Sequence, residues 1–171
     1  MSCIDNCSIT SLNSKWSLFY HLPQNKSWDL LSYVNIDGIG YIDTLEKLIA
    51  INKYIPENII KYCMLFVMLK GVSPMWEDIK NRNGGCFSYK VVNKFVCDVW
   101  RELVYLLCTS GLTVKTTNMS KITGITISPK RNFCIIKIWL TDCSVQDPTS
   151  IVQIENLTKL GCIFKKHVPE F

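Results

Sequence analysis

Short apolar runs broken by turn residues are the feature that most restricts how this chain can fold. Each run is about five to nine residues long and rich in β-branched or aromatic side chains, which is typical of strands and too short for most buried helices. Glycine, proline or asparagine separates many of the runs, as expected where a chain reverses. The pattern predicts about seven strands, over residues 15–20, 30–36, 64–69, 86–92, 122–128, 133–141 and 162–168.

Helical signals, either periodicity or capping residues, separate three further stretches from these strands. Residues 93–108 place apolar side chains at helical spacing, and residues 43–55 do so after the capping-box pair Asp43 and Glu46. A third helix is predicted over residues 147–161, because the Asp-Pro pair at its start is typical of an N-cap followed by proline and a glycine closes the range.

The chain is long enough for one domain with a continuous core, at 171 residues. We expect residues 1–13 to form a flexible N-terminal arm and residues 14–171 to form the domain. The strands and helices together predict an α+β fold, with a single curved, mainly antiparallel sheet backed by three helices.

From the lengths of the apolar runs and the N-terminal pattern we expect neither a membrane-spanning nor a secreted protein. The longest apolar run, residues 63–69, is far shorter than the roughly 18–20 residues that span a bilayer. The N-terminus lacks the basic flank and apolar stretch of a signal peptide. We therefore expect a cytoplasmic location, which is the host cytoplasm if the source is a virus.

Several kinds of chemistry are also disfavoured. Nine cysteines without a C-x-x-C pair and only two histidines indicate reduced thiols, so we expect no metal and no cofactor. Nucleophile and phosphate-loop motifs are missing from the sequence, so we expect no catalytic residue and no enzymatic activity. The net charge of +5 favours a polyanionic partner.

Two tryptophans lie in segments without strand or helix periodicity. Trp28 ends a polar loop, and Trp76 stands in a loop broken by glycine and proline, directly before Glu77. An exposed indole is a surface on which a base can stack, and a positively charged base such as N7-methylguanine is attracted to its electron-rich face. A carboxylate beside the base can accept hydrogen bonds from its N1–H and N2 groups together, which selects guanine.

The segment 71–81, followed by Gly84-Gly85, resembles the signature of the eukaryotic translation initiation factor 4E family. The string P-M-W-E-D-x-K-N is highly specific, and the likeness continues through residues 26–28, 99–103 and 138–143 in the family's order. The resemblance implies a divergent member of the family, with a curved eight-stranded antiparallel sheet, three dorsal helices and the mRNA cap bound in the concave slot.

The same resemblance implies roles for four residues. The positions that resemble Trp28 and Trp76 stack on the N7-methylguanosine base, the one that resembles Glu77 reads its edge, and the one that resembles Trp139 touches the methyl group. Because Trp139 stands in an apolar strand, core packing remains an alternative for it. Trp16 and Trp100 are interpreted as structural, on a strand and on an apolar helix face.

The chain departs from the family where the cap phosphates bind. Lys130 replaces an arginine of a basic hairpin loop and Arg131 is its neighbour, so these two are the candidate phosphate contacts. Asn132 and Ile135 stand at two lysine positions of the family, and Cys86 stands at an arginine position. We expect a thin phosphate grip and greater reliance on the base, unless lysines elsewhere substitute, such as Lys115, Lys121 and Lys165.

The dorsal surface also departs from the family. Ile49 replaces the tryptophan that receives helical peptides of the scaffold factor 4G and of repressors, with Leu45 and Leu48 beside it. A helical peptide of a 4G-type scaffold, either the standard one or a non-standard one, is therefore the expected protein partner, and capped mRNA is the expected nucleic-acid partner. Two functions follow: a cap-binding translation factor, or a cap-sequestering repressor that does not recruit the standard scaffold.

Overall fold

A single open sheet organises the computed structural model, which describes residues 9–36 and 40–167. Its strands are β1 (Ser11–His21), β2 (Val34–Asn35), β3 (Ile42–Thr44), β4 (Met64–Leu69), β5 (Gly85–Val92), β6 (Ile122–Pro129), β7 (Phe133–Leu140) and β8 (Ile163–Lys166). They run in the order β2-β1-β4-β6-β7-β5-β8, with β3 also pairing β1. All these pairs are antiparallel, which confirms the predicted antiparallel sheet.

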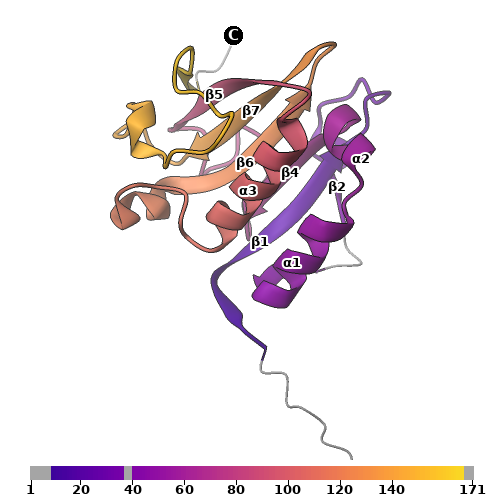
Figure 1. Ribbon diagram of the computed structural model, residues 1–171, viewed down its shortest axis with the longest axis horizontal. Coiled ribbons are helices and arrows are strands. Elements are labelled where there is room, and N and C mark those ends of the chain that lie inside the picture. The colour runs from indigo at the N-terminus through magenta and orange to yellow at the C-terminus, as the bar shows by residue number, and fades with distance from the viewer. Residues whose placement is uncertain (1–8, 37–39, 168–171) are drawn as a thin grey trace, which may run out of the picture.

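Three α-helices cover one face of this sheet: α1 (Leu45–Tyr54), α2 (Glu57–Tyr62) and α3 (Val96–Cys108) (Figure 1). The apolar side of α3 lies against the sheet, and Trp100 is fully buried there. Trp16 of β1 belongs to the same core, so both tryptophans interpreted as structural are confirmed as core residues. The helix-facing side of the sheet is thus committed to the core.

The predicted third helix over residues 147–161 is wrong. Only the 3-10 turn η4 (Pro148–Ser150) forms there, although the Asp147 side chain does accept a hydrogen bond from the Thr149 N–H, at 2.8 Å. Ile151 then pairs with Thr113 as an isolated bridge. Apolar residues three positions apart can thus be buried by extended chain as well as by a helix. The third helix of the fold is α2, which begins directly after Pro56, the proline that follows α1.

Other boundaries differ for local reasons. Of the strand predicted over residues 30–36, the first part is the 3-10 turn η1 (Leu30–Ser32), capped by the Asp29 carboxylate, and only β2 pairs with β1. The N-cap of α1 is Thr44 rather than Asp43. A further 3-10 segment, η3 (Thr116–Lys121), precedes β6.

Residues 11–13 of the predicted N-terminal arm belong instead to β1, which begins at Ser11, opposite Thr44 of β3. Residues 1–8, which make up most of that prediction, lie outside the described part of the chain. Residues 37–39 also lie outside it, and Gly40, which follows them, has a positive φ of +65° that glycine adopts readily. In the described residues, none of the helices has the length and apolar character needed to traverse a bilayer.

Candidate functional site

The face of the sheet opposite the helices carries a cavity of about 280 Å³. Its floor lies on β4, β6 and β7, where side chains alternate between the two faces of the sheet. Phe66, Thr126 and Trp139 therefore line the cavity while their neighbours in sequence belong to the core. We call it the tryptophan cavity; its lining residues are Trp28, Tyr33, Met64, Phe66, Pro74, Met75, Trp76, Glu77, Thr126, Ser128, Lys137 and Trp139.

Trp28 forms one wall of this cavity, from the loop that follows β1. Its ring is 55% exposed and stacks on His21, with ring centroids 4.3 Å apart and planes 4° from parallel. His21 is buried, and its Nε2 lies 2.9 Å from the Ser27 carbonyl oxygen, to which it can donate. His21 itself does not line the cavity. It therefore packs against one face of the Trp28 indole, while the indole still borders the cavity.

Trp76 and Glu77 come from the loop between β4 and β5, which buried polar groups hold in place. The Asn81 amide is fully buried and donates to the carbonyl oxygens of Ser73 (3.2 Å) and Met75 (2.8 Å). The Asp78 carboxylate accepts a hydrogen bond from the Ser73 N–H at 2.8 Å. The motif residues after Glu77 thus shape the loop, a role that sequence reasoning did not assign to them.

Gly84 lets the end of the same loop approach β7 closely. A Cβ at this position would lie 1.7 Å from the Leu140 carbonyl oxygen, closer than any side chain can come. The Gly84 carbonyl oxygen in turn accepts a hydrogen bond from the His167 N–H, at 3.0 Å. The loop that carries Trp76 is therefore tied to the sheet at its end.

Glu77 is exposed at the edge of the tryptophan cavity, and Tyr33 lies near it. Burial raises the pKa of Tyr33, and the negative charge of Glu77 raises it further. The Tyr33 hydroxyl therefore stays protonated at neutral pH. Tyr33 was not among the predicted site residues, because nothing in its local pattern separates it from an ordinary strand residue.

Trp139 both packs and lines the cavity, so its two interpretations are compatible. It is 7% exposed and clusters with Phe66 and Met68 on the open face of the sheet. Its Nε1–H donates to Thr126 Oγ1 at 2.7 Å, which fixes the orientation of the indole. The fold therefore brings Trp28, Trp76 and Glu77 together with Trp139 around one cavity.

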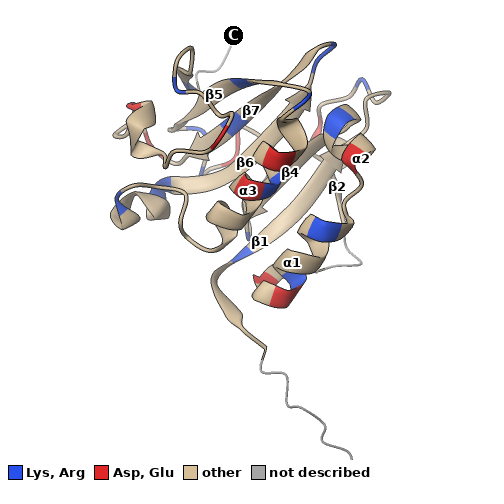
Figure 2. Ribbon diagram, viewed as in Figure 1, with Lys and Arg blue, Asp and Glu red and all other residues tan. Residues whose placement is uncertain are grey.

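The predicted phosphate contacts stand apart from this group. Lys130 and Arg131 are exposed at the tip of the β6–β7 hairpin, where Figure 2 shows a blue segment, and neither lines the tryptophan cavity. The Lys130 N–H donates to the Phe133 carbonyl oxygen at 2.8 Å and closes the hairpin. Lys130 and Arg131 are close in sequence to Ser128, which lines the cavity. Neither of the two basic residues lines the cavity itself.

A second cavity, of about 410 Å³, lies beside the tryptophan cavity and shares Trp76, Lys137 and Trp139 with it. We call it the lysine cavity; its lining residues are Trp76, Cys86, Lys137, Trp139, Lys165, Lys166 and His167. Sequence reasoning missed Lys137 and Lys166 and considered Lys165 only as a substitute. The available signal was the alternation along β7, which puts Lys137 on the same face as Trp139.

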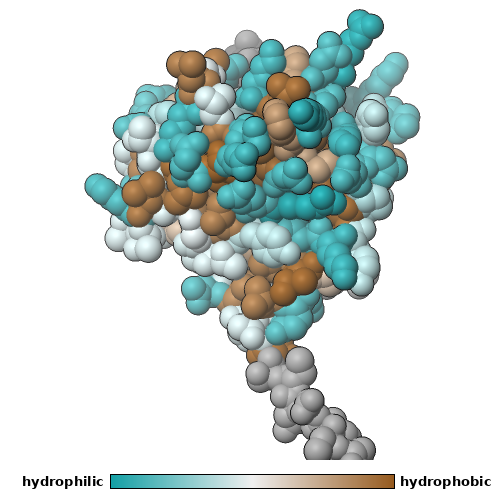
Figure 3. All heavy atoms as spheres, viewed as in Figure 1, coloured by the Kyte–Doolittle hydropathy of each residue, from teal (hydrophilic) through white to brown (hydrophobic). Residues whose placement is uncertain are grey.

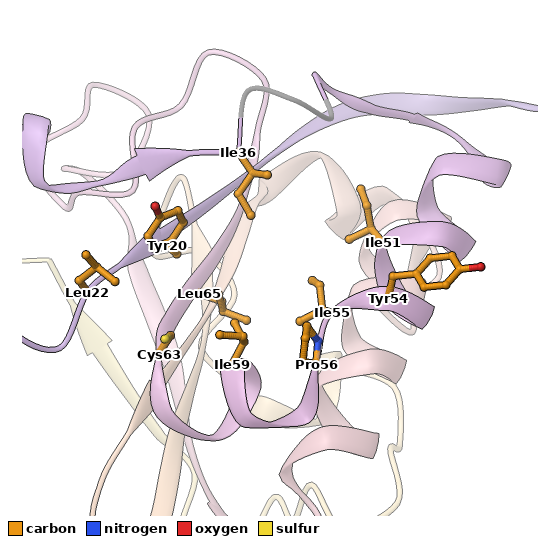
Figure 4. A pocket seen from close by; sticks show the side chains of 10 residues that line it. All are labelled: Tyr20, Leu22, Ile36, Ile51, Tyr54, Ile55, Pro56, Ile59, Cys63 and Leu65. Atoms are coloured by element: carbon orange, nitrogen blue, oxygen red, sulfur yellow. The ribbon is translucent and has the colours of Figure 1, made fainter.

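A third cavity, of about 370 Å³, lies near α1 and α2 and is almost entirely apolar. Figure 4 shows side chains such as Tyr20, Ile51 and Ile59 gathered around it from β1 and both helices. None of its lining residues is charged, so nothing there could select a nucleotide by charge. We therefore place the candidate ligand site in the tryptophan cavity.

The dorsal prediction needs one correction. Leu48 is fully buried in the core between α1 and the sheet, so it cannot contact a partner. Ile49 is 45% exposed and Leu45 is half-buried, and these two remain on the surface of α1. Figure 3 shows hydrophobic side chains gathered over α1 on this face of the molecule. The sequence places all three residues close together on α1. It did not reveal that Leu48 faces the core while Leu45 and Ile49 lie on the surface.

A metal centre finds no support among the residues that the structure describes. Across residues 9–36 and 40–167, no group of three or more His, Cys, Asp or Glu side chains is placed to hold a metal ion. What the cavities offer is a set of aromatic faces, one carboxylate and several ammonium groups. Such a set can bind a ligand that is flat at one end and negatively charged at the other.

Comparisons with known proteins agree on one family. Residues 11–167 match the model of the family described as Eukaryotic initiation factor 4E. The factor 4E of Eremothecium gossypii is 32% identical over 162 residues, which cover 90% of this chain and 69% of the relative. Human factor 4E is 25% identical over 168 residues, covering 92% of this chain and 69% of its own length. A factor 4E homologue of Acanthamoeba polyphaga mimivirus is 39% identical over 62 residues, 36% of this chain and 23% of the homologue.

Solved structures show the same fold. Factor 4E-3 of Ascaris suum, in complex with an m7G cap, gives a TM-score of 0.69 at 18% identity, covering 80% of this chain and 76% of that one. A schistosome factor 4E, in complex with m7GpppG and a 4E-binding protein, gives 0.68 at 24% identity, covering 80% and 74%. At these identities the likeness concerns the fold alone. Since the family match extends over nearly all described residues, the chain belongs to the eukaryotic initiation factor 4E family.

Proposed function

We propose that this protein binds the N7-methylguanosine cap of mRNA and acts in translation initiation, without carrying out a chemical step. The observation that carries the proposal is the convergence of Trp28, Trp76 and Glu77 on one cavity, from two loops that lie far apart in the sequence. Family membership and the cap-bound structures of the Ascaris suum and schistosome proteins support it.

Binding would proceed by stacking and charge. The methylated base, which carries a positive charge, lies between the indoles of Trp28 and Trp76, each stack contributing about 1–3 kcal/mol. The Glu77 carboxylate accepts hydrogen bonds from the guanine N1–H and N2 groups, which adenine cannot offer in that arrangement. Trp139, whose ring is oriented by its hydrogen bond to Thr126, contacts the N7-methyl group. Lys130 and Arg131, at the hairpin tip, are the phosphate contacts that the sequence indicates.

A direct binding experiment tests this proposal. Tryptophan fluorescence is followed while 7-methyl-GTP or GTP is titrated into the protein. We expect about a 5–30-fold preference for the methylated nucleotide, which corresponds to the cation–π contribution. Glu77→Gln should weaken 7-methyl-GTP binding about 10–150-fold, because a hydrogen bond to a charged acceptor is lost. The matched control is Glu155→Gln, an exposed acid away from both cavities. Equal affinity for the two nucleotides would refute the proposal.

The expected protein partner is a helical peptide of a 4G-type scaffold, bound at α1 around Ile49 and Leu45. The 4E-binding protein present in the schistosome structure supports a peptide partner for the family. In this chain the surface is reduced, since Leu48 is buried and Ile49 replaces a tryptophan. Ile49→Ala should weaken scaffold-peptide binding in a pull-down, and unchanged recovery of the peptide would contradict a site at Ile49.

The reduced dorsal surface also favours a second candidate function, a cap-sequestering repressor. Such a protein would occupy caps without recruiting the standard scaffold. A translation extract depleted of its own factor 4E separates the two functions. Restored cap-dependent translation on addition of this protein would establish an initiation factor. No restoration, together with inhibition of an undepleted extract that added resident factor 4E reverses, would establish a repressor.

A further inference from the structure

We propose that the phosphate chain of the capped ligand binds in the lysine cavity, chiefly to Lys137 and Lys165, and only secondarily to the hairpin pair Lys130 and Arg131. This inference rests on the proposed cap binding, which supplies the base in the tryptophan cavity. It assigns the anion-binding site to side chains that come from two strands of the sheet, β7 and β8.

The two cavities lie side by side and share three lining residues. Trp76, Lys137 and Trp139 line both, so a ligand whose base lies in the tryptophan cavity has the lysine cavity directly beside it. These three residues already face the open side of the sheet. One ligand can therefore contact both cavities without any side chain moving out of the core. The negatively charged part of the ligand can therefore reach the ammonium groups while the base remains stacked.

Strand register brings Lys137 and Lys165 to the two strands on either side of Cys86. Lys137 precedes Trp139 by two residues on β7, so the two share a face about 7 Å apart along the strand. Lys165 on β8 is paired with Cys86 on β5, which is paired with Trp139 on β7, placing Lys165 about 10 Å across the sheet. Long, flexible side chains from these two positions can converge on one anion.

The cysteine at position 86 explains why positive charge for the phosphates has to come from Lys137 and Lys165. It stands where the family resemblance places an arginine, and it is a small, buried side chain at the floor of the lysine cavity. Lys165 lies directly across from it, and Lys137 lies on the strand at its other side. Burial raises the pKa of the Cys86 thiol, while the ammonium groups of Lys137 and Lys165 act on it in the opposite direction, as expected if both charges are near. The missing charge is thus supplied from the neighbouring strands.

The charge of the lysine cavity is not neutralised within the described residues. Its lining includes Lys137, Lys165 and Lys166 but no carboxylate. The ion pairs found among residues 9–36 and 40–167 join other lysines or arginine to Asp43, Glu57 and Asp142. Gathering like charges is unfavourable unless an anion binds between them. A triphosphate is such an anion, and it is attached to the proposed base.

The test measures what the phosphates add to binding. Dissociation constants for 7-methyl-GMP and 7-methyl-GTP are determined by tryptophan fluorescence. The ratio of the 7-methyl-GMP constant to the 7-methyl-GTP constant is then compared among variants. We expect the double variant Lys137→Gln/Lys165→Gln to reduce that ratio about fivefold or more, and to lower the slope of log affinity against log salt by about 0.7 per lost contact. Lys165→Gln alone, at an exposed position, should show part of the effect without a risk to folding.

Two further variants complete the design. Lys130→Gln/Arg131→Gln should change the ratio less than the cavity variant does, and Lys53→Gln/Lys94→Gln, which removes the same charge from exposed positions outside both cavities, should leave it unchanged. An unchanged ratio in both cavity variants, or a larger loss in the hairpin variant, would overturn the inference. Loss of the methylation preference in the unmodified protein would instead overturn cap binding, and the ratio of GTP to GMP affinity would still test the lysine cavity.

Discussion

The two faces of the sheet use the same strands for opposite purposes. On the helix side, Ile125 and Ile138 are fully buried in the main core. On the open side, the residues next to them, Thr126 and Trp139, line the tryptophan cavity. Because side chains alternate along a strand, one strand can build both faces. Stability and ligand binding should therefore respond to different substitutions, even at adjacent positions.

The largest expected effect is on the helix side. Trp100→Ala removes a fully buried indole from between α3 and the sheet, and a cavity of that kind costs about 3–5 kcal/mol of unfolding free energy. Urea unfolding followed by circular dichroism measures the loss. Binding of 7-methyl-GTP at a temperature where the variant is still folded should remain near that of the unmodified protein. A variant that kept its stability would show that this face is not the main source of the fold's stability.

A smaller effect is expected on the open side. Trp28→Ala should weaken 7-methyl-GTP binding about 5–150-fold, equivalent to one stacking contact of about 1–3 kcal/mol. Because Trp28 is half-exposed, the urea midpoint should change little. Tyr62→Ala, which removes an exposed aromatic ring on α2, serves as the control and should affect neither property. A Trp28→Ala protein that lost stability but not affinity would reverse the comparison between the two faces.

His21 belongs to the open side of the sheet, where its buried ring stacks on Trp28. His21→Leu removes the aromatic pair, which contributes about 0.5–1.5 kcal/mol, and should weaken cap binding about 2–12-fold by leaving the indole less well oriented. His21→Phe keeps a ring beneath Trp28 and should restore most of the affinity. Titration with 7-methyl-GTP measures both variants, and equal affinities for them would rule out a positioning role for the ring.

The smallest expected effect concerns pH. Burial lowers the pKa of His167, and Lys137 acts in the same direction, while a hydrogen bond from its Nδ1 to the Asn81 carbonyl oxygen (2.7 Å) opposes them. The folded state therefore binds a proton less readily than the unfolded chain, whose histidine pKa is about 6.5. Stability should be fully present above about pH 6.5 and decline as the pH falls through the lower folded pKa.

Urea midpoints at about pH 7.5 and about pH 5.5 measure this decline. His167→Gln, whose amide can still donate to the Asn81 carbonyl oxygen, should show less of it. The carboxyl groups of Asp43, Glu46 and Glu57 have lowered pKa values and contribute only at more acidic pH. An equal decline in the variant would assign the pH dependence to other groups.

Local patterns were sufficient for much of the fold and part of the site. Periodicity predicted α3 and most of the strands, because burial of one helix face or one strand face leaves a regular trace in the sequence. The motif around Trp76 and the loop position of Trp28 indicated the stacking residues. The start and stop signals of a helix failed at residues 147–161, where most of the chain is extended, and the resemblance failed at Leu48, which is buried in the core.

Residues that lie close together in the chain were enough to predict an α+β fold with an antiparallel sheet, two loop tryptophans and an acidic neighbour. Three features could be found only in the folded protein: Trp28 and Trp76 border one cavity, His21 supports the first of them, and Lys137 and Lys165 flank Cys86. The physical reason is strand pairing: β8 adds beside β5 and β5 beside β7, and this register, set by hydrogen bonds between distant segments, brings the lysines to the edge of the tryptophan cavity.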